Sequence, residues 1–219
     1  MDVADWVVCV PVIAPRSETA AARATWDVDA PNLLVVDNTP GGDYADGPWR
    51  YHHEGRNLGV AASWNKGIAL GKEFTVFMSS YLVLDEGLAR TVERMIEAAN
   101  DYGCLTWQAC HAWGFTRKTF EVAGTFDERF RVAYHEDAEF IRRLEVTGCH
   151  SAANPMPKIA VPGSCPQARS IHLGLAAPPM QANHDRLVAK WGGVYPDFTF
   201  EHPWNDPSID IRDWDRDGP

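Results

Sequence analysis

Residues 32–38 read Asn-Leu-Leu-Val-Val-Asp-Asn, an apolar run that ends in a carboxylate and a carboxamide. A continuous run of this kind is typical of a strand buried on both faces of a parallel sheet. The turn residues Thr-Pro-Gly-Gly follow at 39–42 and end the strand. Similar apolar runs occur at 6–13 and 74–78. The pattern predicts parallel strands with polar side chains at their carboxyl ends.

Helical spacing alternates with these strands. Ala61, Trp64 and Ile68 share one face of a helix, and Leu88 and Val92 begin the apolar stripe of a second. We expect further strands at 51–54, 104–109 and 169–173, and further helices at 20–26, 116–122, 136–147 and 181–191. This alternation predicts an α/β fold with a mostly parallel central sheet flanked by helices.

The length of 219 residues suits one domain and a tail. We expect a single domain over 1–195 and an acidic, Trp-containing tail over 196–219, which wraps the domain or is disordered. No apolar run approaches the about 20 residues of a membrane span, and the acidic amino terminus is unlike a secretory signal. We therefore expect a cytoplasmic protein without a membrane anchor.

Charge and cysteine content exclude other classes. The formal net charge of -10 disfavours broad nucleic-acid binding. The 5 cysteines are odd in number and form no close C-x-x-C pair. This spacing favours reduced, buried thiols over a disulfide framework or a zinc ribbon.

Several polar residues admit both a chemical and a structural interpretation. Ligands of open parallel sheets bind beyond the carboxyl ends of the strands, where Asp37 either accepts from a nucleotide or caps the amides of its own turn. Gly67 marks either a close ligand or close packing of its helix on the sheet. His172 is either a metal ligand or a core histidine.

Acidic residues gather at the start of the helix expected at 136–147. Glu136, Asp137 and Glu139 lie where the helix dipole stabilises negative charge, which is a structural reason for their presence. A carboxylate at this position that faces a cleft also serves as a general base. Both interpretations stay open on the residues alone.

Short motifs follow one another along residues 6–193. In chain order they are Val36-Asp37-Asn38, Asn57-Leu58-Gly59 with Asn65-Lys66-Gly67-Ile68, Gly124-Thr125-Phe126-Asp127-Glu128-Arg129-Phe130, His135-Glu136-Asp137 with Phe140-Ile141-Arg142-Arg143-Leu144, and Asn183 with Lys190-Trp191-Gly192. In this order they resemble the GT-A fold glycosyltransferases of family 2 and their rhamnosyltransferase-like relatives.

The resemblance implies an inverting enzyme that transfers a sugar from a UDP-, GDP- or dTDP-sugar to an acceptor hydroxyl. Asp137, or alternatively Glu136, would be the base. The donor side would comprise Pro11, Val12, Asp37, Asn38, Asn57, Gly59, Asn65, Lys66, Ser79, Ser80 and Tyr81. Trp107, Trp113 and Gly114 would lie on the acceptor side, although aromatic residues here fit a core equally well.

One departure from the family concerns its metal site. Ser79-Ser80-Tyr81 stands where the family carries an acidic D-x-D pair that holds Mn²⁺ or Mg²⁺ against the diphosphate. The metal is then held by other groups such as His172 and Asp137, or replaced by Lys or Arg, or the site is inactive. A catalytically inactive GT-A binding module is therefore the alternative function. A nucleotidyltransferase is disfavoured because no G-x-x-x-x-G-K loop follows the first strand.

The acceptor is left open by the sequence. Candidates are a glycan precursor, a protein, a small molecule or a modified DNA base. The DNA case needs a local basic cleft, for which Arg117, Lys118, Arg129 and Arg131 are available.

Overall fold

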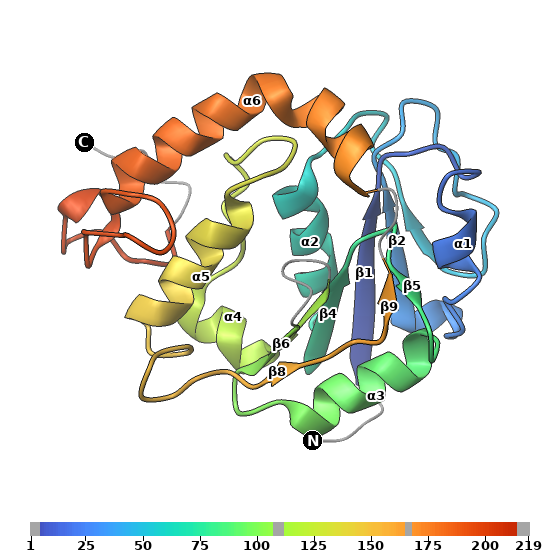
Figure 1. Ribbon diagram of the computed structural model, residues 1–219, viewed down its shortest axis with the longest axis horizontal. Coiled ribbons are helices and arrows are strands. Elements are labelled where there is room, and N and C mark those ends of the chain that lie inside the picture. The colour runs from blue at the N-terminus through green and yellow to red at the C-terminus, as the bar shows by residue number, and fades with distance from the viewer. Residues whose placement is uncertain (1–4, 107–111, 165–167, 214–219) are drawn as a thin grey trace.

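A seven-stranded sheet forms the centre of the protein (Figure 1). The computed structural model describes residues 5–106, 112–164 and 168–213, with no side chains described over 168–178. The strand order is β3-β2-β1-β4-β7-β6-β8. The strands are β1 (Trp6–Val12), β2 (Leu33–Asp37), β3 (Arg50–His52), β4 (Phe74–Met78), β6 (Gly103–Thr106), β7 (Ala112–Thr116) and β8 (Lys158–Ile159).

The sheet is mostly parallel. Strands β3, β2, β1 and β4 pair in parallel, and β6 pairs in parallel with β8. Strand β7 is inserted between β4 and β6 and is antiparallel to both. A separate two-stranded sheet joins β5 (Val83–Leu84) to β9 (Gly163–Ser164). The predicted α/β architecture is therefore confirmed.

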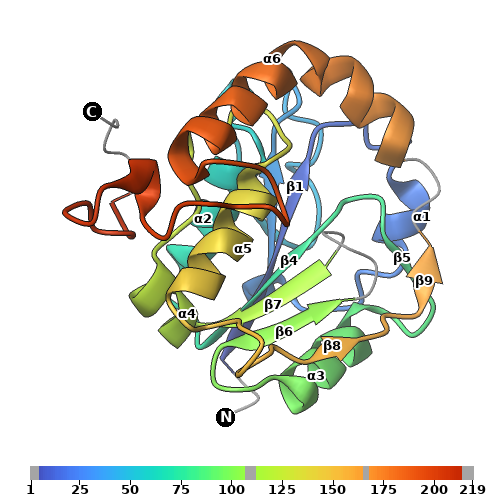
Figure 2. The ribbon, with the colours of Figure 1, turned by 60° about the vertical axis from the view of Figure 1, so that its left-hand side comes forward.

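Helices cover both faces of the sheet (Figure 1). One face carries α1 (Ala20–Arg23), the 3-10 turn η1 (Ala30–Asn32) and α3 (Leu88–Ala98). The other carries α2 (Val60–Ile68), α4 (Arg117–Ala123) and α5 (Glu136–Val146). Helix α6 (Ala168–Trp191) runs past the edge of the sheet at which β1 ends, toward α5 (Figure 2).

Two buried layers explain why the first strand is apolar throughout. Val8 and Val10 pack into the cluster that contains Met95 of α3. Val7 and Cys9 point to the opposite face and pack into the cluster that contains Trp64 of α2. Since successive strand residues point to opposite faces, both sets must be apolar when helices cover both sides.

Some local predictions are wrong. The region at 169–173, expected as a strand, lies inside helix α6, which also contains the expected helix at 181–191. Strand β7 was not predicted. Helix α1 covers only part of the helix expected at 20–26, and its N-cap, Thr19, makes no side-chain cap hydrogen bond. None of the helices described is long and apolar enough to cross a membrane.

The tail wraps the domain as far as it is described. Residues 196–213 include the 3-10 turn η2 (Pro203–Asn205) and lie beside α5 and α6 (Figure 2). The guanidinium of Arg142 donates to the carbonyl of Phe200 at 2.7 Å. The ring of Trp204 lies over Arg129 and Lys190, with the charged groups 5.3 and 5.4 Å from its centroid. Residues 200 and 204 therefore contact the 124–130 loop, α5 and α6.

Candidate active site

Asp37 ends β2 inside a dense set of hydrogen bonds and is only 1% exposed. Its Oδ1 accepts from the backbone and hydroxyl of Thr39 at 2.9 and 2.6 Å. Its Oδ2 accepts from the backbone amides of Asp43 and Tyr44 and from the hydroxyl of Tyr51 at 2.7, 3.1 and 3.1 Å. This geometry is that of a turn carboxylate that caps backbone amides, one of the two interpretations of Asp37.

Asn38 ties the end of β2 to the start of α2. It is 4% exposed. Its Oδ1 accepts from the backbone of Leu58 at 2.8 Å, and its Nδ2 donates to Ser63 Oγ of α2 at 3.0 Å. Its own amide donates to the carbonyl of Val12 at 2.7 Å. The predicted donor-side residues Val12 and Asn38 therefore share one edge of the sheet with the amino end of α2.

The amino end of α2 in turn contacts the segment before α5, residues 131–135. Gly59 has φ +83°, and a Cβ there would lie 3.0 Å from the backbone nitrogen of Val132. The amide of Val60 donates to the carbonyl of Val132 at 2.8 Å. Exposed Asn57 supports this turn by accepting from the amide of Gly59 at 2.8 Å. Glycine is required at position 59 because other residues disfavour this positive φ and because a Cβ would lie too close to the backbone of Val132.

Segment 131–135 has an unusual backbone. Val132, Tyr134 and His135 have φ values of 65, 76 and 72°. Each left-handed residue other than glycine costs about 1–2 kcal/mol, and a β-branched residue such as Val132 is a pronounced outlier. Such strain persists only where surrounding contacts hold it, and it is concentrated at functional sites.

Helix α5 begins directly after this segment with the two predicted acids. Glu136 is 5% exposed, and its Oε2 has no hydrogen-bond partner among the described residues. Burial and the neighbouring charge of Asp137 raise the pKa of Glu136 well above its usual range. Asp137 is half-buried, and its Oδ1 accepts from the amide of Ala138 at 2.8 Å. Glu136 is thus an enclosed acid, whereas part of the Asp137 side chain is exposed.

Two histidines lie beside the acids. The rings of His135 and His184 are 5.5 Å apart and meet edge to face. Burial lowers the pKa of His135, partly offset by Asp137, and His184 lowers it further. Neither histidine was predicted as a site residue. The spacing of His184 on α6 gave no signal, because its partner is 49 residues away in sequence.

A buried ionic network, comprising Asp127, Arg129, Glu139, Arg143 and Lys190, lies behind the acids. Lys190 of α6 binds Asp127 Oδ2 at 3.0 Å and Glu139 Oε1 at 2.7 Å. Arg143 donates to Glu139 Oε2 at 2.8 Å, and Arg129 to Asp127 Oδ2 at 2.7 Å. These residues of the family-like motifs therefore form structural ion pairs that join the 124–130 loop, α5 and α6.

Two further donor-side candidates face the same loop. Asn65 Nδ2 donates to the carbonyl of Phe126 at 2.9 Å, and its Oδ1 accepts from the amide of Phe126 at 2.9 Å. Lys66 binds Glu54 Oε1 at 2.7 Å. Lys66 and Arg131 also line a small cavity of about 110 Å³. Asn65 is thus a bracing residue, whereas Lys66 presents its charge at a cavity.

Gly67 follows on the same helix and packs against the sheet. A Cβ at this position would lie 2.7 Å from Cys9 Cβ of β1. Close packing of helix on sheet, the second interpretation of this glycine, therefore accounts for it.

The remaining donor-side candidates follow β1 and β4. Phe77 of β4 pairs in parallel with Cys9 of β1, so Ser79 and Ser80 lie at the same edge as Pro11. Ser80 and Tyr81 are each 3% exposed. The described residues contain no group of 3 or more His, Cys, Asp or Glu side chains that could hold a metal ion. His172 lies in α6, and its side chain is outside the described set.

The acceptor-side expectations need correction. Trp113 is 3% exposed and lies 5.7 Å from Trp64 in the core. A Cβ on Gly114 would lie 2.5 Å from the ring of Phe74. Both residues belong to strand β7, which is buried on both faces, so neither residue is accessible to an acceptor. Trp107 and His111 lie outside the described residues.

Three of the four basic residues considered for a DNA acceptor form ion pairs. Arg117 pairs with Glu73, Lys118 with Asp101 and Arg129 with Asp127. The fourth, Arg131, lines the small cavity that also contains Lys66.

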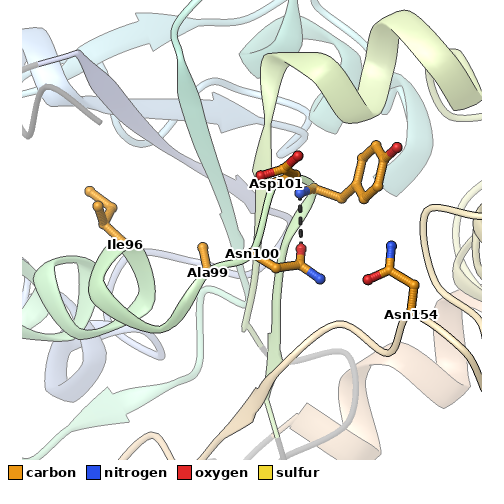
Figure 3. A pocket seen from close by; sticks show the side chains of 6 residues that line it. Ile96, Ala99, Asn100, Asp101 and Asn154 are labelled. Atoms are coloured by element: carbon orange, nitrogen blue, oxygen red, sulfur yellow. Dashed lines mark hydrogen bonds between the residues drawn. The ribbon is translucent and has the colours of Figure 1, made fainter.

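A larger cavity of about 540 Å³ lies at the opposite edge of the sheet (Figure 3). It is formed by the last turn of α3 and the start of β6, and Asn100 and Asn154 are directed toward one another across it. Asn100 Oδ1 already accepts from the amides of Tyr102 and Gly103. The cavity therefore lies away from the strand ends and from the acids of α5.

No protein-family model and no curated protein matches the sequence. Among solved structures, the fold is similar to mannosyltransferase PcManGT from Pyrobaculum calidifontis in complex with GDP-Man and Mn²⁺. The TM-score is 0.53 at 15% identity, over 85% of this chain and 72% of that chain. GalNAc-T7 with UDP, GalNAc and Mn²⁺ aligns with a TM-score of 0.49 at 10% identity, over 86% of this chain and 48% of that chain. The fold of this protein is that of the GT-A glycosyltransferases.

Proposed function

We propose that this protein is a glycosyltransferase that moves a sugar from a nucleotide-sugar donor to an acceptor hydroxyl with inversion. The observation that carries the proposal is the placement of Glu136 and Asp137 in the first turn of α5, directly after strained segment 131–135. Hydrogen bonds through Val60 and Leu58 connect that segment to the end of β2. The acids therefore belong to the strand-end region, where ligands of open α/β sheets bind.

Asp137 is the better base of the two acids. In the proposed step the acceptor O–H gives its proton to the Asp137 carboxylate while its oxygen bonds to the anomeric carbon. The bond between that carbon and the diphosphate oxygen breaks, and the nucleoside diphosphate leaves with the electron pair. Asp137 is half-buried, whereas Glu136 is 5% exposed. Burial, together with the charge of Asp137, raises the pKa of Glu136 and favours its protonated form, which makes Glu136 the poorer proton acceptor.

The donor would bind along the amino end of α2. Exposed Asn57 and half-buried Lys66 lie on this approach. The cavity beside Lys66 is lined by three cations, Arg56, Lys66 and Arg131, and by the carboxylates of Glu54 and Glu128. The cations would offset part of the charge of a leaving diphosphate, in exchange for the ion pair that joins Lys66 to Glu54 at 2.7 Å. Asp37 and Asn38 are buried, and their side chains are hydrogen-bonded within the protein. They would therefore fix the backbone around the site rather than bind the nucleotide directly.

The described residues do not fit a metal site of the D-x-D type. Ser79 and Ser80 carry no carboxylate, and no described cluster of acids, histidines or cysteines replaces them. We therefore assign no step to a metal ion, and metal dependence becomes a variable of the experiment.

The first experiment is a thermal-shift panel. UDP-glucose, GDP-mannose and dTDP-rhamnose are each added with and without Mn²⁺ or Mg²⁺, because a ligand that binds the native state raises the melting temperature. Stabilisation by one donor supports the proposal and identifies the nucleotide. An absence of any shift contradicts it.

The second experiment follows release of nucleoside diphosphate from the donor that binds. Asp137→Asn should reduce turnover by about 100-fold or more while donor binding is kept, since the acceptor loses its base. The isosteric Glu136→Gln is the matched control and should retain more turnover. Binding without any turnover in the wild type would instead favour a GT-A binding module.

A further inference from the structure

Asn183 of α6 forms hydrogen bonds with segment 131–135 through every polar atom of its side chain. It is 2% exposed. Its Oδ1 accepts from the amide of Arg131 at 3.2 Å. Its Nδ2 lies 3.0 Å from the carbonyl of Arg131 and 3.1 Å from those of Ala133 and Tyr134. One carboxamide therefore binds the backbone on both sides of left-handed Val132.

The segment has little support of its own. The amide of Ala133 donates to the carbonyl of Arg131 at 3.1 Å within it. The N-cap of α5, His135, is left-handed and makes no side-chain cap hydrogen bond. A left-handed run of this kind persists only where outside contacts determine it. Asn183 and the amide of Val60 supply those contacts.

We propose that Asn183 is a positioning residue that holds segment 131–135 and thereby fixes where α5 begins and how Glu136 and Asp137 are presented. This proposal rests on the proposed transferase function. Asn183 touches neither acid directly, so its effect passes through the backbone of the segment.

The rest of α5 is held independently of Asn183. Lys190, two helical turns further along α6, binds Glu139, the fourth residue of α5, at 2.7 Å. Loss of Asn183 should therefore loosen the residues of α5 that precede Glu139 and leave the packing of α5 on α6 in place. This separation makes a positioning role distinguishable from general destabilisation.

The test compares Asn183→Ala with Met95→Ala, a control in buried helix α3 on the opposite face of the sheet. Hydrogen exchange of apoprotein amides needs no substrate. The Arg131 amide should exchange at least about tenfold faster in Asn183→Ala than in wild type, while Met95→Ala leaves it unchanged relative to global stability. Asn183→Gln, which keeps the polar groups but displaces them, serves if the alanine variant does not fold.

Catalysis supplies the second readout, with release of nucleoside diphosphate from UDP-glucose, GDP-mannose or dTDP-rhamnose. Asn183→Ala should lower kcat about tenfold or more, leave KM for the donor unchanged and shift the pH profile of kcat. A loss of kcat no larger than that of Met95→Ala, or unchanged exchange at Arg131, overturns the proposal. If wild type releases nothing from all three donors, the transferase function fails, and exchange alone decides whether Asn183 holds the segment.

Discussion

Glu136 should make the protein less stable as the pH rises. Its side chain is 5% exposed, and its Oε2 lacks a partner among the described residues. Burial, and then the charge of Asp137, raise the pKa of Glu136 well above the ordinary 4.5. The native state therefore keeps a proton that the unfolded chain has lost. Stability is full below the unfolded pKa and declines as the pH rises toward the native pKa.

The size of the effect follows from linkage. One proton bound by the native state and not by the unfolded state changes the free energy of unfolding by about 1.4 kcal/mol per pH unit. Between pH 5 and 7 the wild type should lose up to about 3 kcal/mol relative to Glu136→Gln. The amide keeps the shape of the acid and does not ionise, so the variant lacks this loss.

The assay is urea unfolding of wild type and Glu136→Gln at half-unit steps from pH 5 to 8. All other titrating groups are shared, so the difference in unfolding free energy isolates Glu136. Glu54→Gln is the control, because ion pairs with Lys66 and His52 lower the pKa of Glu54 to about 2. Its contribution is lost only as the pH falls below 4.5, so its offset should stay constant in this range. A constant offset for Glu136→Gln as well would refute the reasoning.

Three more predictions concern the interior. Lys190→Met should cost about 3 kcal/mol or more in urea unfolding, because it removes a cation from two buried carboxylates. Gly67→Ala should cost about 1–3 kcal/mol, since its Cβ would meet Cys9 Cβ at 2.7 Å, whereas Gly41→Ala, with nothing within 4 Å, should be close to neutral. Burial raises the pKa of Cys9 and of Cys104 to about 12, so mass-mapped labelling by a thiol reagent at pH 8 should reach them only after unfolding.

The fold could be predicted where burial alone decides the residue pattern. Strands β1, β2 and β4 are covered on both faces, and their continuous apolar runs predicted them to within a residue or two. Strand β7 reads Ala-Trp-Gly-Phe-Thr and lacks such a run. Its structure depends on pairing with β4, which lies about forty residues earlier in the sequence. The local residue pattern also predicted a strand at 169–173, where the structure has helix α6.

The site could be predicted in its residue types but not in its geometry. The acids at the start of α5 were readable because helix starts favour carboxylates. The left-handed conformations of Val132, Tyr134 and His135 could not be predicted, because Val and Tyr disfavour positive φ and His adopts it only in a minority of cases. They follow from contacts with Asn183 and Val60, which lie far away in the sequence. Asn183 belonged to a recognised motif, yet its spacing alone did not reveal what it binds.

Asn183 and Lys190 together explain why the carboxyl-terminal helix matters for acids that lie about fifty residues earlier. Seven residues apart on α6, they contact the backbone before α5 and the buried carboxylate of Glu139. A buried ion pair adds little net stability, because its desolvation cost rivals its attraction, and apolar residues of similar size often serve as well. Hydrogen bonds, however, depend on distance and angle, so the bonds of Asn183 and Lys190 specify the position of α6 relative to α5. We infer that this polar contact between α5 and α6 serves the placement of Glu136 and Asp137 more than the stability of the fold.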